Sequence, residues 1–110
     1  MIHYLESPAA QEQIDEMLEA WEIVIKVAVD VRRGVLAGGG KMHADCEAEL
    51  LVRGSKQDDI WGATWVPLPR EVRYDSLINI RPSQNPAMEI LDEQTRARVG
   101  RIVTELLGAT

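Results

Sequence analysis

The spacing of apolar residues changes from a helical period to a strand period at Trp21, and this change limits the possible folds more than any other feature. Before it, apolar residues recur three and four positions apart, at Ile14, Met17, Leu18 and Trp21. From Trp21 to Val31 every second residue is apolar, and most of these residues are β-branched. The pattern predicts an amphipathic helix over about residues 9–20, begun by Ser7 and Pro8, followed directly by a half-buried strand.

Two further strands and a second helix are predicted later in the chain. Gly34 accepts the positive φ of a hairpin turn after the first strand. Residues 60–66 read as a strand with Trp61 and Trp65 on one face, and residues 74–80 as another that Pro82 ends. Asp92 can cap a final helix whose apolar stripe is Val99, Ile102, Val103, Leu106 and Leu107.

Residues 36–50 can be interpreted in two ways. Even positions are apolar or small and odd positions from 41 to 49 are polar, which favours a strand with a bend at Gly38–Gly40. Residues 44–52 are also rich in helix formers, and Gly54 could cap the C-terminal end of a helix. We expect the strand because the alternation is longer than the helical match.

These elements predict an α+β fold in which residues 1–110 form a single domain. It has an antiparallel four-stranded sheet with an N-terminal and a C-terminal amphipathic helix. A chain of 110 residues is long enough for one hydrophobic core, and no repeat or linker divides it.

Composition and charge exclude several classes of protein. The single cysteine, Cys46, cannot form a disulfide within the chain, and the chain opens without the pattern of a signal peptide, so we expect a cytoplasmic location. No apolar run is long enough to span a bilayer. The net charge is −6 and the whole excess lies in residues 1–30. We therefore expect neither nucleic acid nor a membrane as a partner.

His43, Asp45 and Glu47 form the most suggestive group of catalytic residue types. On a strand, these three side chains would project from one face, where an imidazole and two carboxylates could act as acid and base. A divalent cation would need more ligands, so we expect no metal and no cofactor. The simpler interpretation is a solvated polar face. If the segment is helical, His43 and Glu47 still share a face but Asp45 turns away.

The loop after residue 80 is the first choice for a ligand-binding site. Arg81, Ser83 and Gln84 supply a guanidinium, a hydroxyl and an amide, which together could hold an anion. The competing interpretation is that Arg81 pairs with a local acid and that Ser83 satisfies the backbone of the turn.

Three other features suggest chemistry and do not support it. The Gly38–Lys41 run lacks the first glycine and the following hydroxyl of a phosphate-binding loop. Cys46 lies on the apolar side of its segment, which is typical of an inert buried thiol. Paired tryptophans such as Trp61 and Trp65 are more often core or interface than a stacking platform.

The middle of the chain resembles a family of small uncharacterised prokaryotic proteins. The matching strings are Met42–Asp45, Gly54–Gly62 and Asp75–Gln84, and the resemblance covers about residues 22–85. The family implies no activity, so it assigns no functional residue. Its members continue past the Ser-Gln pair with glycine and basic residues, whereas this chain has Asn85–Met88, which weakens the anion-site hypothesis.

The sequence favours a non-catalytic module that binds another protein or a second copy of itself. A small sheet with one helix at each chain end can leave a face or an edge open, and a homodimer would cover it. The alternative is a small hydrolase or phosphate-ester enzyme in which His43, Asp45 and Glu47 act on an anion held by Arg81, Ser83 and Gln84. A small regulatory partner protein is also compatible with the composition.

Overall fold

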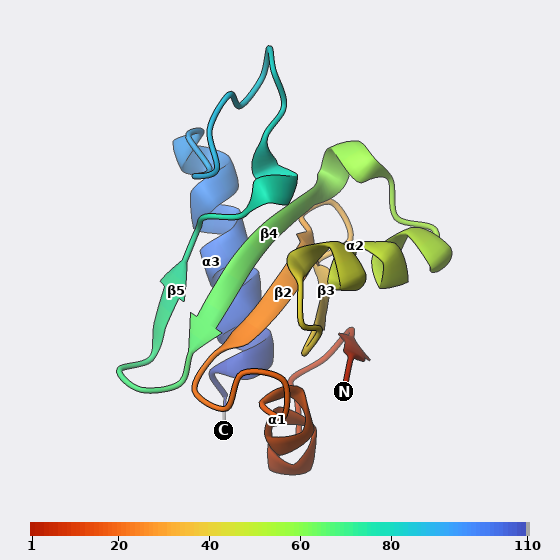
Figure 1. The fold of residues 1–110 in the computed structure, drawn as a ribbon, viewed down its shortest axis with the longest axis vertical. Coiled ribbons are helices and arrows are strands. Elements are labelled where there is room, and N and C mark those ends of the chain that lie inside the picture. Colours follow the sequence, from red (N-terminus) through yellow and green to blue (C-terminus); the bar gives the residue numbers. More distant parts are fainter. Residues whose placement is uncertain (110) are drawn as a thin grey trace.

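The computed structural model describes residues 1–109 as one antiparallel sheet between helices (Figure 1). The strand order is β1-β3-β2-β4-β5, and every neighbouring pair is antiparallel. In chain order the elements are β1 (His3–Leu5), α1 (Gln11–Met17), β2 (Ile25–Asp30), β3 (Val35–Gly38), α2 (His43–Val52), η1 (Gln57–Asp59), β4 (Ile60–Val66), β5 (Glu71–Arg73), η2 (Leu77–Asn79) and α3 (Glu93–Leu107). The α+β class and the antiparallel sheet are as predicted, but the sheet has five strands rather than four.

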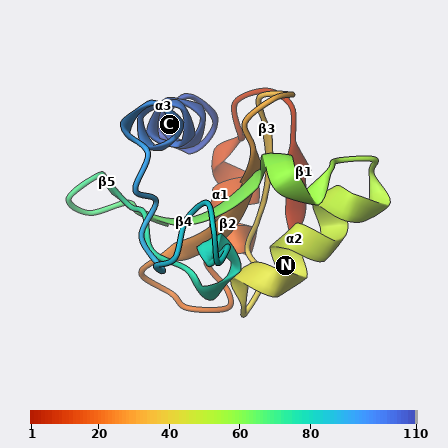
Figure 2. The ribbon, with the colours of Figure 1, turned by 90° about the horizontal axis from the view of Figure 1, so that it is seen from above.

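The sheet separates two apolar cores, and Figure 2 shows α3 and α2 on opposite sides of it. On one face, Val27 and Val29 pack with α1 and with the predicted stripe of α3. Trp61 and Trp65 lie in this larger core, so they are core residues and not an interface. On the other face, Cys46 and Leu50 of α2 pack on the alternate residues of β2, β3 and β4.

The first helix is shorter than predicted. It begins after Ala10, whose backbone N–H donates to the Gln13 side chain, and not at Ser7. Ile14 and Met17 are buried as the stripe predicts, but Trp21 lies beyond the helix and is 46% exposed. Glu22 takes a positive φ of 65° in the turn that leads into β2, so the helix cannot run on into the strand.

The second helix, α2, replaces the strand predicted within residues 36–50. Gly39 ends β3 with a φ of 100°, where a Cβ would meet the Met1 carbonyl at 2.2 Å. Asp45 then caps the helix by accepting from the Met42 N–H at 3.1 Å. Cys46 and Leu50 are four residues apart, so the same apolar positions fit a helix face as well as an alternation. The strand prediction is correct for residues 36–38, which belong to β3, and wrong from residue 43, where the alternative interpretation as a helix that stops before Gly54 is correct.

The strand predicted at residues 74–80 is also absent, because this segment folds as η2 and irregular chain. Only Asp75 pairs there, as an isolated bridge with Glu89. On the side of β4 away from β2, the ladder partner is instead the short β5, in a segment where no strand was predicted. Farther along β4, the side-chain amide of Asn79 takes the place of a strand, with Oδ1 accepting from Gly62 N–H at 2.7 Å and Nδ2 donating to Gly62 O at 3.0 Å.

The final helix agrees with its prediction. Asp92 accepts from the Thr95 N–H at 2.9 Å, and all five predicted stripe residues of α3 are buried. In residues 1–109 no helix has the length and apolar character needed to cross a membrane.

Candidate functional site

The helical form of residues 43–52 sends the three predicted catalytic side chains in different directions. His43 points onto the sheet, with Nε2 2.9 Å from the Ala63 carbonyl oxygen. Asp45 caps its own helix and faces the glycine bend at Gly40. Glu47 lies one turn after His43, and its charge is one of those that oppose the lowering of the Arg81 pKa by burial. No three acidic, histidine or cysteine side chains among residues 1–109 converge as metal ligands.

The His43 ring is held as one neutral tautomer. A carbonyl oxygen can only accept, so Nε2 carries the hydrogen that is bonded to Ala63, and Nδ1 keeps its lone pair. Thr64 Oγ1 lies 3.4 Å from the same nitrogen. Burial lowers the pKa of His43, opposed by the hydrogen bond to Ala63, and the imidazole is therefore uncharged at neutral pH.

Arg81 is already occupied by backbone acceptors. Its guanidinium donates to the carbonyl oxygens of Gln57 at 3.2 Å, of Asp58 at 3.3 Å and of Ile60, and it lies 3.7 Å from the centre of the Trp61 ring. Burial lowers the pKa of Arg81, opposed by the neighbouring carboxylates. This arrangement fastens the loop to η1 and leaves the guanidinium few free donors for an anion.

Residues of the two predicted groups line different pockets. Arg81, Ser83 and Gln84 line a pocket of about 300 Å³, and His43 lines another of about 280 Å³. Ile78 belongs to both walls and separates them. Asp45 lines a third pocket, at the glycine bend. The catalytic and anion-binding roles of these residues therefore stay predictions.

Cys46 is fully buried, as its position in the sequence predicts. Burial raises the pKa of the thiol to about 11, and Sγ contacts the carbonyl oxygen of Lys26 at 3.4 Å. A thiol in this state is not a nucleophile at neutral pH.

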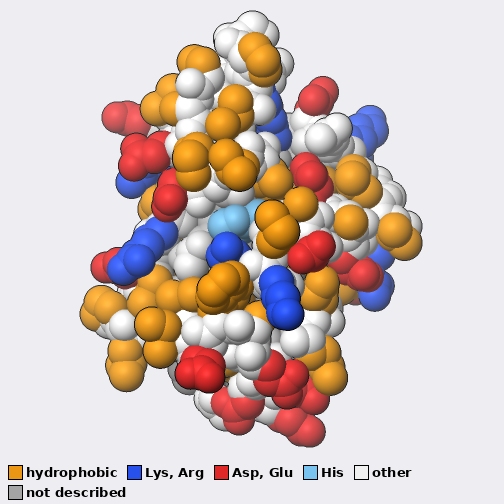
Figure 3. Space-filling view, viewed as in Figure 1, with side chains coloured by type: hydrophobic (Ala, Val, Ile, Leu, Met, Phe, Trp, Pro, Cys, Tyr) orange, Lys and Arg blue, Asp and Glu red, His pale blue; other side chains and the backbone are white. Residues whose placement is uncertain are grey.

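The pocket at His43 opens onto an exposed apolar surface. Met42, Leu77 and Met88 line the pocket beside Lys26, and Ile80 lies next along the loop. These four side chains, which we call the apolar face, are 58%, 66%, 43% and 45% exposed in the order Met42, Leu77, Met88 and Ile80. Figure 3 shows apolar side chains gathered over this part of the molecule, with histidine at its centre.

The loop that carries most of the apolar face is fixed by two buried asparagines. Besides its pair with Gly62, Asn79 donates to the carbonyl oxygens of Tyr74 and Met88. Asn85 donates to Asn79, Ala87 and Glu89 and accepts from the Leu91 N–H. Both asparagines are 2% exposed or less, and their hydrogen bonds therefore hold the loop in one conformation as it projects from the sheet.

The apolar face was not predicted from the sequence. Residues 77–80 were assigned to a half-buried strand, which would hide half of them. The usable signal was the number of large apolar residues in residues 77–91, a stretch that also contains two prolines and two asparagines. Such a stretch has too many turn-forming residues for a regular element that could bury them all.

Comparisons with known proteins give a family and no function. A search of curated proteins and a search of solved structures each returned no match. The model of a family described as "Protein of unknown function (DUF5674)" matches residues 3–106, nearly the whole chain. This agrees with the resemblance seen in the middle of the sequence and extends it to both ends. The chain belongs to the DUF5674 family.

Proposed function

We propose that this protein is a non-catalytic protein-binding module whose binding surface is the apolar face. The observation that carries the proposal is the exposure of four large apolar side chains, of which Met42, Leu77 and Met88 line the pocket at His43 and Ile80 lines the adjoining pocket. Single exposed apolar residues are ordinary on protein surfaces, but a contiguous group marks an interaction site. Leucine, isoleucine and methionine offer contact area without acid–base or nucleophilic chemistry.

The rigidity of the loop supports the same proposal. Ordering a flexible loop on binding costs free energy, and a loop already fixed by Asn79 and Asn85 avoids most of that cost. A rigid scaffold that presents an apolar loop is a common arrangement for recognition. The side chains of a partner would enter the pocket between Met42 and Met88.

Photo-crosslinking tests the proposal directly. A benzoylphenylalanine placed at Leu77 should give a discrete crosslinked product in cells that produce the protein naturally. The matched control is the same group at Val52, which is 83% exposed at the far end of α2 and outside the apolar face. Mass spectrometry of the product identifies the partner, and an added Met88→Asp substitution should abolish the product.

If position 77 gives no more crosslinking than position 52, the apolar face is not a binding surface and the proposal is wrong. A product that survives Met88→Asp would also contradict it, because the contact would then not depend on the apolar face.

A further inference from the structure

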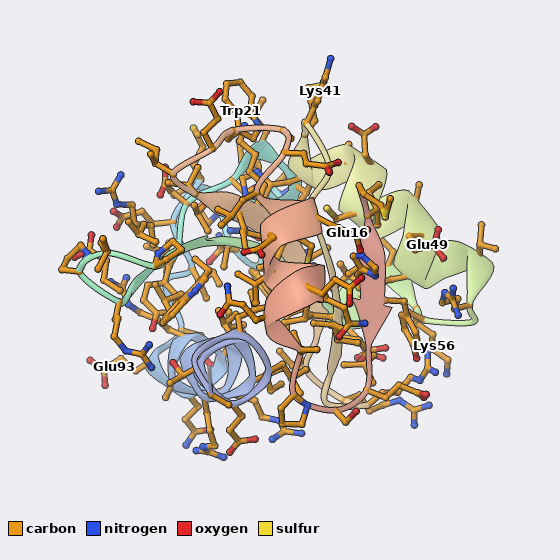
Figure 4. All side chains as sticks on the ribbon, turned by 90° about the horizontal axis from the view of Figure 1, so that it is seen from below. Glu16, Trp21, Lys41, Glu49, Lys56 and Glu93 are labelled. Carbon is orange, nitrogen blue, oxygen red and sulfur yellow. The ribbon has the colours of Figure 1, made fainter. Side chains whose placement is uncertain are left out.

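Lys26 supplies an unpaired positive charge at the apolar face. It is half-buried in β2, lines the pocket with His43 and Met42, and its ammonium lies 4.7 Å from the centre of the Trp21 ring. Trp21 is itself held in place, because its indole N–H donates to the carbonyl oxygen of Lys41 at 2.9 Å. Figure 4 shows Trp21 and Lys41 side by side. Lys26 makes no ion pair with any residue in 1–109.

Asp75 and Glu89 supply two unpaired negative charges beside the same pocket. The bonds from Ser76 N to Met88 O and from Ile90 N to Tyr74 O flank them, so they are a non-hydrogen-bonded antiparallel pair. Side chains of such a pair are close and on the same side, and like charges there are unfavourable. The Asp75 charge acts on His43, which places it near the pocket. Neither carboxylate has an ion-pair partner within the described residues.

Leu77 and Met88, both exposed, line the pocket together with Lys26. Met88 directly precedes Glu89, and Leu77 follows Asp75 by two residues. The surface therefore contains a cation, an apolar centre and an anion pair. A dimer with two-fold symmetry needs this kind of self-complementary surface, because the same patch of both subunits is in contact and the two patches are related by a rotation of 180°.

We infer that a second copy of this chain covers the apolar face, with Lys26 of each copy facing the Asp75–Glu89 pair of the other. The inference rests on the proposed function and names its partner. Contact with a lysine relieves the repulsion between the two carboxylates and neutralises a cation that the monomer leaves unpaired. Leu77 and Met88 of both copies then form the dry centre of the interface.

The overall charge of the chain permits this arrangement. The acidic excess of residues 1–30 lies mainly on α1 and its flanks, and Figures 1 and 3 show α1 and a group of acidic side chains at the end of the molecule opposite the projecting loop. Pairing through the apolar face does not need to bring the two acidic ends together. The remaining repulsion between two chains of charge −6 is long-range and is screened by salt.

Charge reversal with rescue tests the inference. Sedimentation equilibrium of the purified full chain should show a monomer–dimer equilibrium. Lys26→Glu and Glu89→Lys should each weaken the dimer about tenfold or more, and the double variant should recover most of that loss. Lys56→Glu makes the same charge change at an exposed lysine far from Trp21 and Lys41 in Figure 4, and it should leave the equilibrium unchanged. Circular dichroism and thermal unfolding verify that each variant folds, and Lys26→Gln replaces Lys26→Glu if that one does not.

Three outcomes would overturn the inference: a monomer at every concentration, single reversals that do not weaken the dimer, or a double variant no tighter than either single variant. Failure here is distinguishable from failure of the proposed function. A protein that stays monomeric yet crosslinks from position 77 to a different protein keeps the binding role and loses only the second copy as its partner.

Discussion

His43 shows how burial turns a titratable residue into a structural one. Its neutral ring donates to Ala63, and its pKa lies below the ordinary value of 6.5 because the ring is desolvated. Well above pH 6.5 the ring is neutral in both the folded and the unfolded chain, so its titration does not affect stability there. Below that value the unfolded chain binds a proton that the folded chain resists, and stability falls until the pH reaches the folded pKa.

We therefore predict that the wild type loses more stability than His43→Gln between about pH 7 and about pH 5. Glutamine can still donate to Ala63 but does not titrate, and all other groups, including His3, are common to both proteins. Urea unfolding at several pH values measures the difference. Parallel stability curves would show that His43 titrates equally in the folded and unfolded states.

At the scale of elements, Asn79 performs the task of a strand. Its amide gives Gly62 both a donor and an acceptor, and it also fixes the carbonyls of Tyr74 and Met88. Asn79→Leu leaves these buried groups unpaired and should lower the free energy of unfolding by about 3 kcal/mol or more. Ser83→Ala, on the exposed tip of the same loop, should change it by less than about 0.5 kcal/mol. Equal losses in the two variants would show that the amide network is not what fixes the loop.

Arg81 joins two elements, the loop and η1, through three carbonyl oxygens and the Trp61 ring. Arg81→Ala should therefore destabilise the fold by about 2 kcal/mol, because three carbonyl oxygens lose a charged donor and the Trp61 ring loses its cation. Chemical denaturation measures the loss, with Arg73→Ala on the exposed β5 as the control. If Arg81→Ala leaves the stability unchanged, and if the wild type binds phosphate while the variant does not, the result would instead support the anion site predicted from the sequence.

At the scale of the whole molecule, the sequence predicts elements well where the apolar pattern has a single interpretation. The final helix agrees with its pattern because it buries one continuous stripe, and the strand of Trp61 and Trp65 because it lies between two cores that bury its alternate residues. The segment from 43 to 52 fits two periods, since Cys46 and Leu50 satisfy both, and only the bend at Gly39 decides between them.

The candidate site was harder to predict because it depends on contacts distant in sequence. The sequence indicates that His43 and Arg81 can carry chemistry, but it does not indicate their hydrogen-bond partners. These partners, the carbonyl oxygens of Ala63 and of η1, belong to other elements. The apolar face depends on hydrogen bonds from the side chains of Asn79 and Asn85 to the backbone, where a strand would have ladder hydrogen bonds. The periodicity of apolar residues does not predict such side-chain bonds. The local apolar pattern thus predicts which residues pack in the core, whereas contacts distant in sequence determine which apolar residues stay exposed.

The short length of β5 has a consequence for how copies of this protein can meet. From Ile60 to Ala63 the outer edge of β4 has no strand beside it, and an uncovered edge of this kind invites an extra strand and, through it, open-ended aggregation. Here Asn79 occupies the backbone of Gly62 and Arg81 occupies the carbonyl of Ile60. Two side chains therefore prevent the addition of a strand at this stretch of the edge. Copies of the protein that meet there must associate through side chains on a face. Such contacts allow a closed dimer and not a growing sheet.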